Sequence, residues 1–588
     1  MHVLYIRSLC SKIVLPIIKE LPIIITFFFL IKGSFLDIQN NDMNNEWDYV
    51  AVFAIWFLYA YFIAAIICVS GKSWVRWLWY VLLYFVFAVS CFISTNFEMK
   101  ISPTLITLLV ETNEREASEF LETYLLSVST VKLILKLFIY VVFTILIEKG
   151  YRYILAKKRQ KETKKKGNIW ASLLVIILLV SALLRWIQFG EIFRFANPGD
   201  AGDRNYPAND IYTRLICSLC IEMSQSAVFE RAIDVSLNAD AATVDDNVID
   251  SLNVVLVIGE SFIKSHASIY GYPLNTTPNM RTLEEKGNLF PFTDVISPYN
   301  YTSMALKNMM SCNSIADGEQ WSDCPYFPIL FRKGGYDVYF WSNQRDFDTG
   351  STYEYALNSY LYDQRLSDYT YTKTNKETFE YDGQLIEDFK KFSTHSPALI
   401  MFHLMGQHIG YEDRFPKVKE HIKFTPSDIK RDEPYIDDNK RQLIANYDNA
   451  TLYCDFVLNQ IIECFEGRNA VLVFLSDHGE EVFDYRDRMG RSYTDKLDSL
   501  CLKYQYEIPF VIWCSDLFKT KNPDVVNNIQ EATDRPFMID NICQVLFRLG
   551  GIHTTYYYPE RDMLSPDFVP KERIIKGGEI NYDGILKK

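Results

Sequence analysis

Apolar residues are distributed unevenly along the chain. Up to about residue 190 they form long runs of Ile, Leu, Val, Phe, Tyr and Trp, whereas the remainder has the mixed usage of a globular protein. A bilayer core needs about 20 largely apolar residues per helix. Five segments meet that length, at 13–32, 50–70, 74–95, 131–148 and 168–187. The pattern therefore predicts a five-helix transmembrane domain over residues 1–187.

Short β-branched runs alternate with amphipathic stretches in residues 250–588. A helix is predicted at 440–465, and buried parallel strands are predicted at 253–259, 336–342, 398–406, 470–476 and 509–515. Strands that alternate with helices are typical of a doubly wound α/β/α sandwich. Residues 188–249 show no long strand signal, and we expect them to form a helical linker against the membrane.

Basic residues predict which side of the membrane the second domain faces. Arg7 and Lys12 precede the first span, Lys72 and Arg76 flank the turn after the second, and the run 157–166 (KKRQKETKKK) separates spans four and five. By the positive-inside rule these segments are cytoplasmic, so everything after about residue 190 is extracytoplasmic. The formal net charge of -13 disfavours a nucleic-acid surface. We therefore interpret the basic run 157–166 as a topology signal rather than as a binding patch.

The extracytoplasmic loop at 96–130 is longer than a simple connection. Its stretch LLVETNEREASEFLETYLL has the periodicity of an amphipathic helix at the membrane surface. Thr112 and Glu116 are four residues apart and so share one face of that helix. This face is either solvated or a contact surface for a ligand.

Polar residues follow three of the predicted strands. Glu260 follows the first strand, Gln407 and His408 follow the third, and Asp477 and His478 follow the fourth. Ligands of open α/β sheets bind outside the carboxyl ends of the strands, and two carboxylates with an imidazole suit Zn²⁺ or Mn²⁺. Two plainer interpretations stay open: Glu260 caps the next helix, and the Asp-His-Gly sequence is turn chemistry. Four other histidines are interpreted as surface or packing residues: His266, His395, His403 and His421.

The twelve cysteines include no zinc-finger arrangement of paired CxxC motifs. Cys217 and Cys220 are expected to line a helix face. Cys312 and Cys324 bracket a short polar stretch in the domain predicted to be extracytoplasmic, where oxidation is permitted. A disulfide is therefore predicted between these two residues.

Six ordered motifs carry a family resemblance: VLVIGES at 255–261, GYPLNTTPNM at 271–280, YNYTSMALKNMMS at 299–311, GQHIGYEDRFP at 406–416, NYDNATLYCD at 446–455 and SDHGEE at 476–481. Together they resemble the alkaline phosphatase and sulfatase superfamily, and within it the phosphoethanolamine transferases that modify lipopolysaccharide or membrane-derived glucans. The resemblance covers nearly the whole chain, because that family also has five membrane helices before an alkaline phosphatase-like α/β/α sandwich.

The resemblance implies specific roles for several residues. One zinc ion would bind to Glu260, Thr302, Asp477 and His478, and Thr302 would also be the nucleophile that accepts phosphoethanolamine. The stretch after Thr302 is compatible with a helix, whose N-terminal N–H groups favour a phosphate.

Three more residues match substrate contacts of the family. His408 matches a histidine that contacts the transferred phosphate or a second metal, and Thr112 and Glu116 match residues that contact the head group. The family's second histidine after Asp-His-Gly is missing, since no His lies between His478 and His553. Arg491 is the expected replacement as a phosphate contact, because a guanidinium binds phosphate oxygens bidentately.

The implied function is transfer of phosphoethanolamine from phosphatidylethanolamine to an envelope acceptor such as lipid A, a core sugar or a periplasmic glucan, in a bacterial inner membrane with the catalytic domain in the periplasm. Two alternatives stay open: a glycerophosphate transferase of the lipoteichoic-acid type, and a catalytically silent membrane sensor. An arylsulfatase is disfavoured because the nucleophile region lacks Cys-x-Pro-x-Arg.

Overall fold

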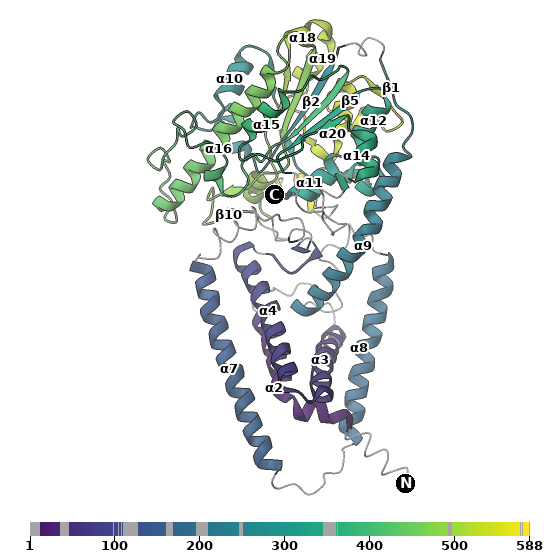
Figure 1. Cartoon of the computed structure of the whole chain (residues 1–588), viewed down its shortest axis with the longest axis vertical. Helices are drawn as coiled ribbons and strands as arrows, with labels where there is room; N and C mark the ends of the chain where they lie inside the picture. Colours follow the sequence, from purple (N-terminus) through teal and green to yellow (C-terminus); the bar gives the residue numbers. More distant parts are fainter. Residues whose placement is uncertain are drawn as a thin grey trace. The chain divides into compact units, whose positions relative to one another are not determined.

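The computed structural model divides into two compact units, residues 1–109 with 121–224 and residues 110–120 with 225–588 (Figure 1). It describes residues 12–35, 46–97, 99–103, 105, 106, 109, 128–159, 169–195, 210–245, 251–344, 360, 361, 363–491, 497–576, 578 and 580–586. The first unit contains the predicted membrane segments, and the second contains the predicted α/β domain.

Long apolar helices make up most of the first unit. Four of them contain segments long and apolar enough to cross a membrane: α3 (Glu46–Ser70), α4 (Ser73–Phe97), α7 (Val128–Arg159) and α8 (Ile169–Phe195). A fifth span is formed if the bent pair Lys12–Lys19 and Leu21–Gly33, the latter part of α2 (Leu21–Phe35), crosses as one. The predicted apolar segments therefore all lie on helices. Helix α9 (Ile211–Leu237) occupies part of the predicted linker.

The first helix pair bends by 67° at Glu20. Pro22 has no backbone N–H, so the Ile18 carbonyl loses its helical partner. Instead, the Tyr151 hydroxyl donates to that carbonyl at 2.6 Å. Arg152 donates to the Glu20 carboxylate at 2.6 Å, and Arg76 does so at 2.8 Å. Side chains of neighbouring helices thus satisfy the polar groups that the bend leaves open.

A seven-stranded sheet is the centre of the second unit. Its order is β3 (Leu289–Pro291), β11 (Phe510–Cys514), β8 (Ala470–Ser476), β2 (Asn253–Gly259), β7 (Ala398–His403), β5 (Asp337–Ser342) and β6 (Lys373–Thr374). Strands β8, β2, β7 and β5 are parallel neighbours, with Gly259 opposite Ser476 and Ile258 opposite His403. The carboxyl ends that carry the polar residues therefore lie side by side.

The prediction that β11 is a parallel strand was wrong. It pairs antiparallel with both β8 and β3. A run of buried apolar residues indicates that both faces of a strand are covered, but it carries no information about strand direction.

Helices cover both faces of this sheet. Alternate residues of β2 face opposite sides: Val255 and Val257 join the apolar cluster with α10 (Pro278–Glu285), α15 (Asp382–Phe389) and α16 (Asp438–Glu463). Val254 and Leu256 join the cluster with α11 (Thr302–Met309), α12 (Phe327–Lys333) and α20 (Ile542–Leu549). Figure 1 shows α15 and α16 on one side of the sheet and α12 and α20 on the other. The predicted α/β/α sandwich is confirmed.

Shorter elements complete the second unit. The helices are α14 (Gln364–Thr370), α17 (Ser499–Gln505), α18 (Asp516–Lys521), α19 (Pro523–Glu531) and α21 (Tyr582–Leu586). The two-stranded pairs are β1 (Thr243–Val244) with β13 (Ile552–His553), β4 (Val295–Ile296) with β12 (Phe537–Met538), β9 (Glu481–Val482) with β10 (Met489–Gly490), and β14 (Ile574–Ile575) with β15 (Ile580–Asn581).

The predicted disulfide between Cys312 and Cys324 is absent, since both residues are free cysteines. The buried Cys312 thiol instead interacts with the thiol of Cys543, on α20. Spacing along the chain did not indicate this third cysteine, which comes more than 200 residues later in the sequence.

Candidate metal and phosphate site

Two strand ends and one helix start bring the predicted metal ligands together. Glu260 directly follows β2, Asp477 and His478 directly follow β8, and Thr302 is the first residue of α11. Ligand atoms of Glu260, Asp477 and His478 all lie within 4.8 Å of one another. The Thr302 hydroxyl donates to Glu260 Oε2 at 3.0 Å and lies 3.3 Å from His478 Nε2. All four predicted ligands thus lie at one point, where Glu260, Asp477 and His478 are fully buried.

The two oxygens of Asp477 have different environments. Oδ1 accepts from the backbone N–H groups of His478 at 2.7 Å and Ser261 at 3.2 Å. Oδ2 is buried and has no hydrogen-bond partner among the described residues. A buried carboxylate oxygen without a donor is costly, and a bound cation would satisfy it. The plainer interpretation of Asp-His-Gly as turn chemistry alone does not account for Oδ2.

His478 is held as a neutral ligand. Its Nδ1 lies 2.9 Å from the Gly479 carbonyl oxygen, which can only accept, so Nδ1 carries the proton. The lone pair of Nε2 therefore accepts from Arg491 Nη1 at 2.6 Å, and Asp477 Oδ2 and Glu260 Oε1 lie 3.2 Å and 3.3 Å from the same nitrogen. Burial and the nearby Arg491 guanidinium lower the pKa of His478 to about 3. A backbone carbonyl that fixes the tautomer is the usual support of a metal-binding histidine.

Two buried carboxyl groups lie next to each other at this site. Burial and the charge of Glu260 raise the pKa of Asp477 well above its ordinary value. Burial would also raise the pKa of Glu260, but the nearby His478, His408 and Arg491 side chains lower it below its ordinary value. Two adjacent carboxylates oppose each other's ionisation, and a divalent cation removes that opposition.

Arg491 is placed at the same site. It follows β10, and its Nη1 lies 2.6 Å from His478 Nε2. This brings a guanidinium next to the Thr302 hydroxyl, the position that a phosphate contact would need. The role itself stays a prediction.

His408 lies near the trio without joining it. Burial lowers the pKa of His408 to about 4, and its Nδ1 has no hydrogen-bond partner among the described residues. A neutral imidazole with an open nitrogen suits a phosphate contact. Thr112 and Glu116, the other two predicted substrate contacts, lie outside the described residues.

Two contacts of Glu260 were not predicted. Gln344 donates to Glu260 Oε2 at 3.2 Å and to the Leu404 carbonyl at 2.7 Å. The Ser261 hydroxyl donates to Glu260 Oε1 at 2.7 Å. Gln344 comes two residues after β5, so the rule that polar residues gather at carboxyl strand ends would have found it. Both donors favour the ionised form of Glu260.

His266, predicted to be a surface or packing residue, is buried and also takes part in two ion pairs that were not predicted. It is 3% exposed, and its ring nitrogens lie between the carboxylates of Asp448 at 2.7 Å and Asp484 at 2.8 Å. His403, in contrast, is buried at the end of β7, which fits a packing role.

The residues present fit a zinc ion. Two carboxylates, one neutral imidazole and one hydroxyl at a single point match the ligand types and number of a four-coordinate site. The trio of Glu260, Asp477 and His478 is the one cluster of this kind in the part of the chain that the structure describes.

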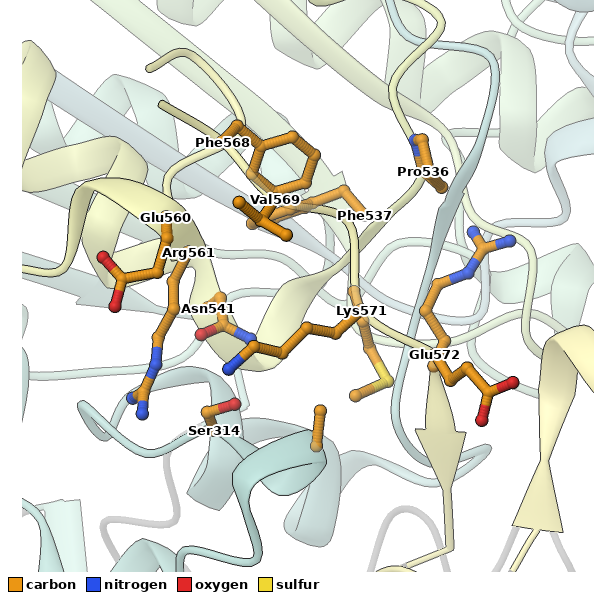
Figure 2. Close-up of a pocket in the computed structure, with 13 residues that line it drawn as sticks. Ser314, Pro536, Phe537, Asn541, Glu560, Arg561, Phe568, Val569, Lys571 and Glu572 are labelled. Carbon is orange, nitrogen blue, oxygen red and sulfur yellow. The ribbon is translucent and has the colours of Figure 1, made fainter. Parts of the chain in front are cut away.

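A separate pocket lies among residues 536–541, the C-terminal segment 560–573 and the segment after α11 (Figure 2). Phe568, Val569 and Phe537 line it on one side, and the polar groups of Asn541 and Arg561 lie on another. Its cavity volume of about 40 Å³ holds a few water molecules. This pocket is therefore too small for a lipid or sugar.

Comparisons with known proteins agree with this geometry. Residues 252–539 match the sulfatase family. The chain is 23% identical over 516 residues to phosphoethanolamine transferase EptC of Escherichia coli (strain K12), covering 83% of this chain and 82% of EptC. The crystal structure of the C-terminal periplasmic domain of Escherichia coli EptC in complex with Zn matches with 26% identity and a TM-score of 0.50, covering 59% of this chain and 96% of that domain.

A membrane-embedded structure matches almost the whole chain. The integral membrane protein lipooligosaccharide phosphoethanolamine transferase A (EptA) from Neisseria meningitidis aligns with a TM-score of 0.54 and 17% identity, covering 95% of this chain and 98% of that protein. The order of apolar helices followed by an α/β domain is therefore a known fold.

Proposed function

We propose that this chain, of which residues 252–539 match the sulfatase family and which is similar to phosphoethanolamine transferases over most of its length, is itself a phosphoethanolamine transferase of the bacterial envelope. The donor would be phosphatidylethanolamine, and the acceptor would be lipid A, a core sugar or a periplasmic glucan.

The main support is the position of Thr302. Its hydroxyl donates to Glu260 at 3.0 Å and stands beside His478 at the start of α11, and the backbone N–H groups at a helix N-terminus favour a phosphate. A structural N-cap would accept a hydrogen bond from its own helix, whereas Thr302 lies one residue inside the helix and donates to a carboxylate. That arrangement suits a nucleophile rather than a cap.

The proposed reaction has two displacements. The Thr302 hydroxyl oxygen forms a bond to the phosphorus of phosphatidylethanolamine, the bond between phosphorus and the glycerol oxygen breaks, and diacylglycerol leaves with a proton. An acceptor oxygen then forms a bond to the same phosphorus, and Thr302 leaves and regains its proton. The proton that Thr302 loses in the first step is the one that the departing glycerol oxygen gains, and the proton that the acceptor loses in the second step returns to Thr302.

Zinc is the proposed cofactor, held by Glu260, Asp477, His478 and Thr302. When bound, it would lower the pKa of the Thr302 hydroxyl and stabilise charge on the phosphate oxygens. The support is the open Oδ2 of Asp477 and the gathering of ligand atoms of Glu260, Asp477 and His478 within 4.8 Å of one another.

Four residues are proposed to hold the substrate. Arg491, beside His478, would bind phosphate oxygens bidentately, and the open nitrogen of His408 would contact the same phosphate. Thr112 and Glu116 would contact the ethanolamine head group, since a carboxylate attracts an ammonium. The catalytic domain is proposed to face the periplasm, because the basic run 157–166 belongs on the cytoplasmic side.

Mass spectrometry of Thr302 tests this proposal. Purified full-length protein with zinc is incubated with phosphatidylethanolamine and no acceptor, and the peptide that contains Thr302 is expected to gain one phosphoethanolamine group. Thr302→Ala should gain none and lose transfer by several orders of magnitude, whereas Thr302→Ser should keep part of the activity because its hydroxyl remains.

Phosphatidylglycerol serves as the matched control donor. A glycerophosphate adduct from phosphatidylglycerol, without an adduct from phosphatidylethanolamine, would establish the lipoteichoic-acid type of activity instead. Full turnover by Thr302→Ala would show that the nucleophile lies elsewhere.

A further inference from the structure

A buried charged triad lies beside the site. His266 Nδ1 lies 2.7 Å from Asp448 Oδ1, and His266 Nε2 lies 2.8 Å from Asp484 Oδ1. Because each nitrogen faces a carboxylate oxygen that can only accept, the ring carries both protons and is positively charged. All three side chains are at most 5% exposed.

Neighbouring groups complete the hydrogen bonding of the triad. The Tyr272 hydroxyl donates to Asp448 Oδ2 at 2.9 Å, and its ring stacks on the imidazole at 4.6 Å. The backbone N–H of Val482 donates to Asp484 Oδ2 at 2.7 Å. Each carboxylate oxygen thus has a donor, which is the condition under which a buried ion cluster holds its parts in fixed positions.

The triad connects the two loops that carry the metal ligands. His266 comes six residues after Glu260, and Asp484 comes six residues after His478. Asp448 lies on the long helix α16, so both loops are tied to one rigid element.

Both loops contain a strained residue that the triad's neighbours hold. Ser261 has φ of +54° and Phe483 has φ of +59°, which non-glycine residues rarely adopt. Tyr447, next to Asp448 on α16, donates to the Ser261 carbonyl at 2.7 Å and accepts from the backbone N–H of Ile263 at 2.7 Å. Arg431 donates to the carbonyls of Phe483 at 2.6 Å and Asp484 at 3.0 Å. Strained backbone persists where the surroundings determine it this closely.

We propose that His266 is a positioning residue for the metal site: through Asp448 and Asp484 it fixes the distance between the loop that carries Glu260 and the loop that carries Asp477 and His478. His266 itself touches none of the ligands in the described contacts. This role rests on the proposed zinc site. It means that His266, which is not a ligand, helps to set the affinity of that site for the metal.

Cobalt binding by the full-length protein in detergent tests the role. Co²⁺ replaces zinc as the probe, because its visible absorption reports the number and geometry of its ligands. His266→Gln can bond only one aspartate and leaves the other carboxylate buried without a cation. It is expected to weaken Co²⁺ binding about 10- to 100-fold, the range found for residues that support metal ligands, and to change the visible spectrum of the bound ion.

Two further variants complete the test. His553→Gln is the matched control, because it removes an exposed His–Asp pair with a 2.6 Å contact to Asp245 on the β1–β13 sheet, and it should bind Co²⁺ like the wild type. Asp484→Asn keeps the pair of His266 with Asp448, so it tests the positioning role if His266→Gln does not fold. This variant is expected to bind Co²⁺ about tenfold more weakly than the wild type. Wild-type affinity and spectrum in both triad variants would overturn the positioning role. Wild-type protein that binds neither Co²⁺ nor Zn²⁺ would instead overturn the proposed metal site.

Discussion

Gly406 links the turn after β7 to Glu260, a proposed metal ligand, and Gly406→Ala should therefore damage the proposed metal site. Its φ is +49°, and an alanine Cβ would lie 2.8 Å from the backbone nitrogen and 2.9 Å from the carbonyl oxygen of Glu260. Asp382 holds this turn from the other side by accepting the N–H groups of Met405 and Gly406, both at 2.9 Å. The turn cannot retreat easily, so Glu260 must move.

The magnitude follows from these distances. An ordinary contact begins at 3.4 Å, so Glu260 or the turn has to shift by about 0.6 Å, whereas metal–ligand distances tolerate about 0.2 Å. Misplacement on the order of 1 Å costs about 100-fold in rate, and we expect kcat to fall about 10- to 100-fold. The positive φ adds about 1–2 kcal/mol of instability for any side chain.

Gly467→Ala separates the two effects. Gly467 has φ of +77°, and an alanine Cβ at this position would have nothing within 4 Å, so alanine there has the backbone cost without a clash. In thermal unfolding Gly467→Ala should lose only the stability that the positive φ costs, and Gly406→Ala should lose that amount plus the cost of the clash. Only Gly406→Ala should lose transfer activity and zinc affinity, measured by competition with a chelator. Equal activity in the two variants would refute the reasoning.

Three other predictions address the metal, the membrane topology and pH. Asp477→Asn keeps an oxygen that accepts from the Ser261 N–H but replaces the open oxygen with an amide NH₂ group. The zinc content measured by elemental analysis should therefore fall from one ion per chain toward zero, and an unchanged zinc content would remove Asp477 from the ligand set. A C-terminal alkaline phosphatase fusion should be active and a fusion within 157–166 inactive, and the opposite result would overturn the orientation. Burial lowers the pKa of His266, but the carboxylates of Asp484 and Asp448 outweigh burial and raise that pKa to about 10. The stability that the charged imidazole contributes should therefore be complete below its ordinary pKa of about 6.5 and be lost as pH rises toward 10. The difference in unfolding free energy between wild type and His266→Gln should shrink over that range, and a difference that grows would contradict the charged state.

Local sequence was enough for most of the sheet and for the ligands on it. Four buried runs became adjacent parallel strands, and the polar residues after β2 and β8 came together because neighbouring parallel strands end at the same edge. Gln344 follows the same rule two residues after β5, although the sequence analysis did not name it. Thr302 was predicted from a motif and a helix-compatible stretch, both of which are local.

The errors concern contacts between distant segments. The direction of β11 depends on how the chain returns to the sheet, which the composition of a strand does not record. The partners of His266 lie 182 and 218 residues away, so no window around His266 contains the two aspartates. The same holds for Cys543, which replaced Cys324 as the contact of Cys312 because α20 packs against that region.

The charges of the site favour one divalent cation over two. Glu260 and Asp477 together carry two negative charges when ionised, and one Zn²⁺ ion balances them. Arg491, at 2.6 Å from His478, then supplies one further positive charge, which equals the single negative charge of a phosphodiester. In the part of the chain that the structure describes, no second group of three such ligands stands beside the trio to hold another ion. A guanidinium also holds its charge at any pH at which the protein is folded. We therefore infer that Arg491, rather than a second metal ion, neutralises the charge of the phosphate while Thr302 attacks it.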